Sequence, residues 1–360
     1  MHFYYKIFLI LLIIISLLCT QKLFRINKKL YTDETFNESA QVLPKNTIQC
    51  YRMNLDTLPD ISKVPPRKDK SIFFHETSCN SFYKGKITIN ARQACAVESA
   101  ALLNPNLDVY LLYSSPGVLQ FSGDESDKFL RALLSYGNVN ILHLDYYKHT
   151  KGTPVEELYK SGKLESSDFV VFHASDVIRF TTLWKYGGIY LDLDVIVTKP
   201  LNKLPLNFAG IERNDSVNSA ILGLASDGIG HSMAEKCLNE LKHNFDGQEW
   251  AKNGPGLITR VLQETCGVTL AKDMVGRNCD GFTVYPQNMF YPIPGPSWKT
   301  LFNKKYLKNI IKETKGSYTI HIWNDISAPR KIPVKSVNSP YLYFARKFCP
   351  KVVKAINKYF

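Results

Sequence analysis

Two aspartates, Asp192 and Asp194, lie in the otherwise apolar end of the stretch HASDVIRFTTLWKYGGIYLDLDVIVTKP, residues 173–200. Residues 189–197 have the composition of a buried strand, on which alternate side chains share a face. Two unpaired carboxylates on one face of such a strand would cost several kcal/mol each. We therefore expect a hard divalent cation, Mn²⁺ or Mg²⁺, between them, because such ions bind carboxylate and phosphate oxygens together. The alternative is that both aspartates lie at a strand end and pair with Arg or Lys.

A helix is predicted immediately before this strand. Ser175 or Asp176 can cap its N-terminus, and Gly187 can end it in a left-handed turn. Asp176 and Arg179 would then share one face of the first turn. A guanidinium beside a metal ion is suited to clamp a diphosphate. Gly188 allows the backbone to approach another segment or a ligand closely.

Strand and helix patterns alternate over the first half of the chain, and this alternation predicts an α/β fold with a largely parallel sheet. The folded part is expected to begin at Ser71, in a short buried strand. The further predicted strands are 108–113 and 139–144, and the predicted helices are 92–103 and 126–136. The 360 residues are 45% hydrophobic and 21% charged, which excludes a chain disordered throughout and a polytopic membrane protein.

Positive charge is concentrated at the C-terminus. The net charge is +13, and residues 301–360 hold 13 Lys/Arg against 2 Asp/Glu. This segment is interpreted either as a patch against anionic lipid headgroups or an acidic substrate, or as a solvated basic tail. No nucleic-acid partner is expected, because the segment has none of the usual nucleic-acid-binding signatures.

The N-terminus is predicted to be a targeting segment. Residues 7–19 are almost entirely apolar, and we expect residues 1–20 to be a cytoplasmic stub with an uncleaved signal anchor, followed by a stem at 21–66 and a catalytic domain at 67–355. The basic flank after the run would place the C-terminal part in the cytosol. Sequons at Asn37 and Asn214 and the cysteine content favour the lumen. Cys266 and Cys279 are expected to pair across a short loop, and the odd cysteine count beyond Cys19 leaves at least one thiol without an intramolecular partner.

The segment WKYGGIYLDLDVIV resembles the DXD region of glycosyltransferase family 32, in its branch of α1,4-galactosyl- and α1,4-N-acetylglucosaminyltransferases. The resemblance runs from about residue 70 to about 350, departs at His75 and at Asp325–Ile326, and rests on further segments in the family's order: IFFHETS (72–78), RQACAVESAA (92–101), NGPGLITRVL (253–262), FYPIP (290–294) and HIWN (321–324). It implies a GT-A nucleotide-diphospho-sugar transferase fold, a DXD sugar-nucleotide-binding part at about 85–210 and an α1,4-glycosyltransferase part at about 225–350.

The resemblance also implies a UDP-sugar donor, a divalent metal and retention of anomeric configuration. It implies a single-pass type II protein of the Golgi membrane with a luminal catalytic domain, which resolves the conflict over orientation. The expected reaction moves galactose from UDP-galactose in α1,4 linkage to a glycosphingolipid such as lactosylceramide. The alternatives are UDP-N-acetylgalactosamine or UDP-N-acetylglucosamine as donor, a glycoprotein acceptor or, more distantly, a non-catalytic sugar-nucleotide or carbohydrate-binding protein.

Each candidate site residue has an expected role. Asp194 is the first expected metal ligand, and Asp192 is expected to contact the metal or the ribose. His321 is a candidate third ligand because neutral imidazole suits Mn²⁺. Front-face attack on the sugar is favoured over a covalent intermediate, because no carboxylate stands out as a nucleophile. The remaining expectations are that Asp176 and Arg179 hold the sugar and phosphates, that Phe74, His75 and Thr77 line a uracil pocket, that Asn218 faces the reacting carbon, and that Tyr190 stacks on the sugar or packs in the core.

Overall fold

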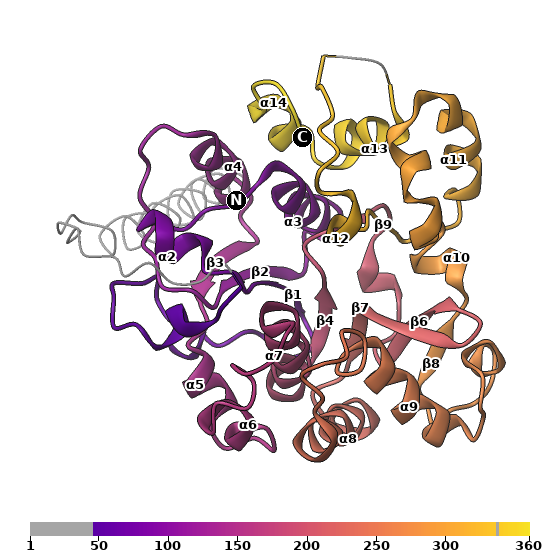
Figure 1. Cartoon of the computed structure of the whole chain (residues 1–360). Coiled ribbons are helices and arrows are strands. Elements are labelled where there is room, and N and C mark those ends of the chain that lie inside the picture. The colour runs from indigo at the N-terminus through magenta and orange to yellow at the C-terminus, as the bar shows by residue number, and fades with distance from the viewer. Residues whose placement is uncertain (1–45, 336–337) are drawn as a thin grey trace, which may run out of the picture. The chain divides into compact units, whose positions relative to one another are not determined.

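The computed structural model describes residues 46–335 and 338–360 (Figure 1). A seven-stranded sheet lies at the centre, in the order β3-β2-β1-β4-β7-β6-β8, and a separate two-stranded sheet pairs β5 with β9. The strands β3, β2, β1 and β4 are parallel, β7 runs antiparallel to both of its neighbours, and β8 is parallel to β6. The prediction of an α/β fold with a largely parallel sheet is confirmed. The strands are β1 (Ser71–Glu76), β2 (Asp108–Tyr113), β3 (Val139–His143), β4 (Gly188–Leu191), β5 (Val195–Val197), β6 (Phe208–Arg213), β7 (Ser216–Leu224), β8 (Thr283–Tyr285) and β9 (Thr319–His321).

Helices cover both faces of the sheet, because its inner strands are apolar on both sides. On β1, Ile72 and Phe74 face one core cluster, and Phe73 faces the other. The first cluster includes side chains of α3, α4, α13 and α14, and the second includes side chains of α7, α8 and α9. The α-helices are α2 (Asn80–Lys84), α3 (Ala91–Leu103), α4 (Glu125–Leu134), α5 (Tyr146–Thr150), α6 (Glu156–Lys160), α7 (Val170–Tyr186), α8 (Gly228–Asn244), α9 (Pro255–Cys266), α10 (Gln287–Phe290), α11 (Leu307–Glu313), α12 (Asn324–Ser327), α13 (Pro340–Phe348) and α14 (Pro350–Ala355). The 3₁₀ helices are η1 (Gln49–Arg52), η2 (Ile61–Lys63), η3 (Leu201–Lys203), η4 (Ala271–Met274), η5 (Gly295–Phe302) and η6 (Lys304–Tyr306).

Two predicted boundaries beside the acidic pair are wrong. The helix expected to begin at Ser175 or Asp176 begins at Val170, so Asp176 lies in its second turn rather than at its cap. The strand expected to run to Val197 ends at Leu191, because the chain turns at Asp192 and then enters the second sheet. The predicted end at Gly187 is confirmed, with φ of +62° at that residue.

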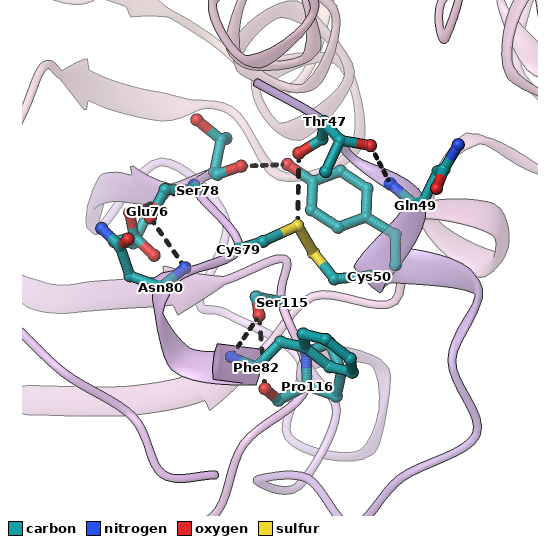
Figure 2. Close-up of a disulfide and its surroundings, with 12 residues drawn as sticks. Thr47, Gln49, Cys50, Glu76, Ser78, Cys79, Asn80, Phe82, Ser115 and Pro116 are labelled. Atoms are coloured by element: carbon teal, nitrogen blue, oxygen red, sulfur yellow. Dashed lines mark hydrogen bonds between the residues drawn. A yellow bond between two sulfur atoms is a disulfide. The ribbon is translucent and has the colours of Figure 1, made fainter. Parts of the chain in front are cut away.

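The folded part begins earlier than Ser71, contrary to our expectation. Ile48 and Ile61, in the segment that we assigned to the stem, are buried in the core on the α7 side of the sheet. The Cys50–Cys79 disulfide fastens η1 to the loop that follows β1 (Figure 2). The sequence contains no periodic pattern here, because the buried Cys50–Cys79 disulfide, rather than the hydrophobic face of a helix, attaches this segment to the core.

The C-terminal residues are not a free tail. The buried Glu98 carboxylate of α3 accepts hydrogen bonds from the amides of Lys351 and Val352, at 2.9 and 2.7 Å, and so caps the first turn of α14. The Cys95–Cys349 disulfide joins α3 to the junction of α13 and α14. Tyr341, Phe344 and Phe348 of this segment therefore belong to the core, whereas Tyr359 and the lysines are exposed.

The predicted disulfide between Cys266 and Cys279 is present, and Cys237 is a free, buried thiol. The predicted signal anchor at residues 1–20 and the sequon at Asn37 lie outside the described residues. Among residues 46–335 and 338–360, we find no helix with the length and apolar character needed to cross a bilayer. Asn214 of the second sequon lies exposed in the turn between β6 and β7.

Two of the disulfides close loops of very different length. Cys95 and Cys349 are 254 residues apart, whereas Cys266 and Cys279 are 13 apart. Loop-closure entropy predicts a loss of about 5 kcal/mol for Cys95→Ala/Cys349→Ala and about 3 kcal/mol for Cys266→Ala/Cys279→Ala. Denaturant unfolding of both double variants measures this difference. An equal or reversed order would mean that the C-terminal helix pair is held by packing rather than by its disulfide.

Glu76, at the end of β1, gives a pH-dependent prediction. Burial raises the pKa of Glu76 from its ordinary value of 4.5 to about 7, although the Ser78 hydroxyl and amide oppose the rise, and one carboxylate oxygen has no partner among the described residues. The folded state therefore binds a proton more tightly than the unfolded state, so Glu76 lowers stability as the pH rises from about 4.5 to about 7. We expect Glu76→Gln to stabilise the protein at pH 8, on the order of 2 kcal/mol, and to have little effect at pH 4.5. Urea unfolding at the two pH values tests this, and an identical effect at both would contradict it.

Candidate functional site

The acidic pair lies in the turn that connects the two sheets. The amide of Asp192 donates to the Ala220 carbonyl of β7 at 2.9 Å, just after β4 ends. The amide of Val195 donates to the Asp192 carbonyl at 3.1 Å and closes the turn. The carboxylates therefore extend from a turn at the carboxyl end of β4, and not from one face of a continuous strand as we expected. In an open α/β sheet this end of a strand is where ligands bind.

Pairing of β5 with β9 brings His321 to Asp194. Val195 lies opposite His321 in the ladder, and the His321 Nε2 is 3.2 Å from Asp194 Oδ1. The other oxygen of Asp194 accepts the backbone N–H of Asn324 at 2.8 Å. Residues 130 positions apart in the sequence thus meet at one carboxylate, and sequence spacing gives no indication of this contact.

Asp192, Asp194 and His321 each present a ligand atom, and these atoms lie within 4.8 Å of one another. Asp192 is about one-third exposed, whereas Asp194 and His321 are nearly buried. Two carboxylates and one imidazole, open to solvent on one side, form a donor set that Mn²⁺ accepts readily and Mg²⁺ accepts through its oxygens. The three residues expected from the sequence to bind a metal are therefore brought together, and they fit one.

The electrostatics of this group follow from burial and pairing. Burial alone would raise the pKa of Asp194, but the His321 imidazole and the Asn324 amide outweigh it and hold that pKa below its ordinary value. Burial would lower the pKa of His321, but Asp194 and Asp192 outweigh it and raise that pKa. Negative charge therefore dominates the position between the three side chains.

Arg179 links Asp192 to the core. Its guanidinium lies 3.4 Å from Asp192 Oδ1 and 3.3 Å from Asp176 Oδ1, and it also donates to the hydroxyls of Ser219 and Ser175. Arg179 is almost fully buried, and each of its three nitrogens has a protein partner. This geometry favours a role in positioning the acidic side chains over direct contact with a diphosphate.

Asp176 is buried beside a glycine turn. Burial raises the pKa of Asp176 to about 7, although Arg179 opposes the rise. A Cβ atom on Gly254 would lie 2.2 Å from Asp176 Oδ1, so only glycine allows the turn before α9 to approach this carboxylate. The segment NGPG, which the sequence singled out, thus borders the site through Asp176.

The buried His75 ring packs against the ring of Tyr190. The two rings have centroids 5.1 Å apart, and the Tyr190 hydroxyl donates to Asp192 Oδ1 at 2.6 Å. His75 Nε2 lies 3.2 Å from the Thr182 hydroxyl, which also contacts His149 at 3.0 Å. Burial, together with Arg179, lowers the pKa of His75 to about 3, so its imidazole is neutral. The Tyr190 ring is 1% exposed, and this burial favours the core-packing alternative over stacking on a sugar.

Three further candidates have mainly structural surroundings. Phe74 is fully buried in the core, and Thr77 is buried with its hydroxyl donating to the Val171 carbonyl. Gly188 has φ of +99°, and a Cβ there would lie 2.5 Å from the Ser71 carbonyl oxygen. A glycine is therefore required at this position by the close approach of β4 to β1. Of the two alternatives left open by the sequence, close approach to another segment or to a ligand, the structure shows the first.

Asn218 on β7 lies beside a carboxylate that the sequence did not single out. Its Nδ2 donates to Glu212 Oε2 at 2.8 Å, and its Oδ1 accepts the amide of Ala220 at 2.7 Å. Glu212 lies at an irregularity in the pairing of β6 and β7, and its charge acts on His321 and Tyr291. No local motif marks Glu212, because only the hairpin register brings it to Asn218.

Comparison with known proteins gives two matching family models. Residues 90–209 match the glycosyltransferase sugar-binding region containing the DXD motif, and residues 226–356 match the alpha 1,4-glycosyltransferase conserved region. The first range includes Asp192 and Asp194, and the second includes His321 and the disulfide-tied C-terminal helices.

Curated relatives cover most of the chain. Lactosylceramide 4-alpha-galactosyltransferase of Mus musculus is 31% identical over 291 residues, covering 80% of this chain and 77% of the relative. The Homo sapiens enzyme of that name is 29% identical, covering 88% and 87%. Alpha-1,4-N-acetylglucosaminyltransferase of Homo sapiens is 25% identical, covering 74% and 76%.

Among solved structures, the PaToxG glycosyltransferase aligns with a TM-score of 0.40 and 18% identity, covering 81% of this chain and 88% of that one, a similarity too low to support an argument. The sequence matches are sufficient without it. They agree in order with the segments identified in the sequence, and they include both the acidic pair and the histidine that the fold brings to it. The chain belongs to the α1,4-glycosyltransferase family and is a glycosyltransferase.

Proposed function

We propose that the protein is a metal-dependent, retaining α1,4-galactosyltransferase that transfers galactose from UDP-galactose to a glycosphingolipid such as lactosylceramide. The convergence of Asp192, Asp194 and His321 within 4.8 Å is the observation that carries this proposal. The names of the relatives support the donor, the linkage and the acceptor. The order of the sheet, with antiparallel β7 beside β4 and the acidic pair at the end of β4, supports the GT-A arrangement.

In this proposal Asp192, Asp194 and His321 hold Mn²⁺ or Mg²⁺. A bound divalent ion supplies positive charge against a diphosphate leaving group, which is the electrostatic contribution that usually dominates such reactions. Arg179 and the Tyr190 hydroxyl hold Asp192 in place by ion pairing and hydrogen bonding. Asp176, held by Arg179 and bordered by Gly254, is the proposed contact to the sugar.

The remaining expected donor contacts stay proposals. His75 and Thr77 lie at the carboxyl end of β1, where the uracil of the donor is proposed to bind, and Phe74 supports them from the core. Asn218, fixed by Glu212 and the backbone, is proposed to face the reacting carbon. Attack of the acceptor hydroxyl from the side of the leaving group would retain the anomeric configuration without a nucleophilic carboxylate.

A second donor has a specific observation in its favour. The match to alpha-1,4-N-acetylglucosaminyltransferase covers 74% of the chain, and His75 departs from the family pattern beside the donor site. UDP-N-acetylglucosamine or UDP-N-acetylgalactosamine would then replace UDP-galactose on the same residues, and the acceptor could be a glycoprotein. A panel of these UDP-sugars against lactosylceramide and other acceptors, with the linkage of each product determined, tests both candidates. If none of the products has an α1,4 linkage, the proposal is overturned.

The proposed location is the Golgi membrane, with residues 1–20 as a signal anchor and the catalytic domain in the lumen. Three disulfides among the described residues support an oxidising compartment, because cytosolic proteins rarely keep such bonds.

Removal of one metal-binding carboxylate should stop transfer without unfolding the protein. We expect Asp194→Asn to lower kcat by at least about 100-fold and to weaken Mn²⁺ binding, because the amide keeps the shape and loses the charge. Asp280→Asn is the matched control, since Asp280 is exposed in a left-handed turn that Asn also adopts. Product formation and Mn²⁺ titration measure the effect, with melting temperature as the check on folding. Normal transfer by Asp194→Asn at saturating Mn²⁺ would show that the metal site is elsewhere.

Glu212 distinguishes front-face attack from a covalent intermediate. Front-face attack predicts that Glu212→Gln loses less than about tenfold in kcat, because a glutamine oxygen can still accept the bond from Asn218. A double-displacement mechanism with Glu212 as nucleophile predicts a loss of several orders of magnitude. Single-turnover kinetics, together with the intact mass of the wild-type enzyme incubated with donor, distinguishes the two mechanisms. A sugar adduct on Glu212 would contradict front-face attack.

A further inference from the structure

A cavity lies between the η5–η6 segment on one side and residues 330–333 with Ser339 on the other. Its volume is about 650 Å³, within the range of sites for small ligands. No Asp or Glu lines it, and four of its lining residues are cationic. The lining residues used below are Trp298, Lys299, Phe302, Lys304, Arg330 and Lys331.

The four cations have no anionic partner in the part of the chain that the structure describes. Across residues 46–335 and 338–360, none of Lys299, Lys304, Arg330 and Lys331 forms an ion pair, although thirteen such pairs occur elsewhere. Like charges gathered around one concave surface repel one another, and this repulsion is relieved when an anion binds. Part of the positive charge noted in the C-terminal sequence therefore surrounds this cavity.

The cavity also has an aromatic wall. Trp298 is only partly buried, and its ring meets Phe302 edge to face with centroids 5.7 Å apart. The Arg92 guanidinium also lies over the Phe302 ring, 5.1 Å from the ring centre. A rigid ring beside several cations suits a ligand that has both an apolar face and a negative charge, as a sugar with a carboxylate or a sulfate does.

Two chains of contacts connect this cavity with the acidic pair. Gly295, at the start of η5, would place a Cβ 3.6 Å from the Trp323 ring, whose centroid is 4.1 Å from that of His321. Gly295 and Trp298 are one turn of 3₁₀ helix apart, about 6 Å along the axis. On a second path, Arg92 donates to the Asn324 side chain at 3.1 Å, and Asn324 donates to Asp194.

We propose that the cavity binds an acidic sugar of the acceptor glycan, one that carries a carboxylate or a sulfate group. This inference rests on the proposed transferase function and narrows the acceptor from neutral lactosylceramide itself to a glycan that also carries an acidic sugar. The contacts through Trp323 and Arg92 connect the cavity with the acidic pair, so the acidic sugar is proposed to lie near the hydroxyl that receives the transferred hexose.

The test measures the binding of lactose and of 3′-sialyllactose to the full-length protein by calorimetry, in the absence of UDP. We expect wild type to bind 3′-sialyllactose about tenfold more tightly than lactose, and Arg330→Gln/Lys331→Gln to lose that preference. The matched control, Lys236→Gln/Lys242→Gln, removes two exposed charges from α8, which belongs to the other face of the sheet, and should keep it. Because the cations are exposed, the preference should also weaken as NaCl is raised.

Each other outcome overturns the inference. Equal binding of the two glycans, no binding up to about 10 mM, or a preference that survives in Arg330→Gln/Lys331→Gln means that the cavity does not recognise the acidic sugar. Full competition by inorganic phosphate at equal concentration means a site for any free anion. Binding only to vesicles of phosphatidylcholine with phosphatidylserine means a membrane-docking surface. UDP binding in the presence of Mn²⁺ is measured separately, so its absence would sink the proposed function while leaving the glycan result interpretable.

Discussion

The closeness of two carboxylates at the edge of a buried sheet is the constraint on which the rest of the site depends. Asp192 and Asp194 repel each other, and each is held by its own partner, Arg179 for the first and His321 for the second. Those partners come from α7 and β9, so the two sheets and the helix must be in place before the acidic pair has a defined geometry. A divalent cation between the carboxylates would relieve their repulsion and carry two positive charges to the position of a diphosphate.

Disulfides and a buried carboxylate hold the outer parts of the chain onto this core. Cys50–Cys79 fixes the N-terminal segment beside the carboxyl end of β1, as Figure 2 shows, and Cys95–Cys349 fixes the C-terminal helices on α3. Glu98 completes the second attachment by capping α14. The same helix α3 presents Arg92 to Asn324, so the C-terminal attachment and the acidic pair share one support.

Much of the fold and most residues of the site could be predicted from the sequence, but the contacts between those residues could not. The strand 108–113 and the helix ending at Leu103 were predictable because their apolar runs and stop signals are local. The acidic pair was predictable from the cost of burying charge. The break after Leu191 was not, because residues 192–197 remain apolar enough for a strand, and only the pairing of β5 with β9 turns the chain. Glu212 was missed for a similar reason, since the register of β6 and β7 decides where it lies.

The most direct measurement of the central claim is a crystal structure of the protein with UDP and Mn²⁺. The account predicts one manganese ion bound to carboxylate oxygens of Asp192 and Asp194 and to both phosphates of UDP, with its anomalous signal at that position. UDP bound in the site with no ion between its phosphates and the acidic pair would contradict the account.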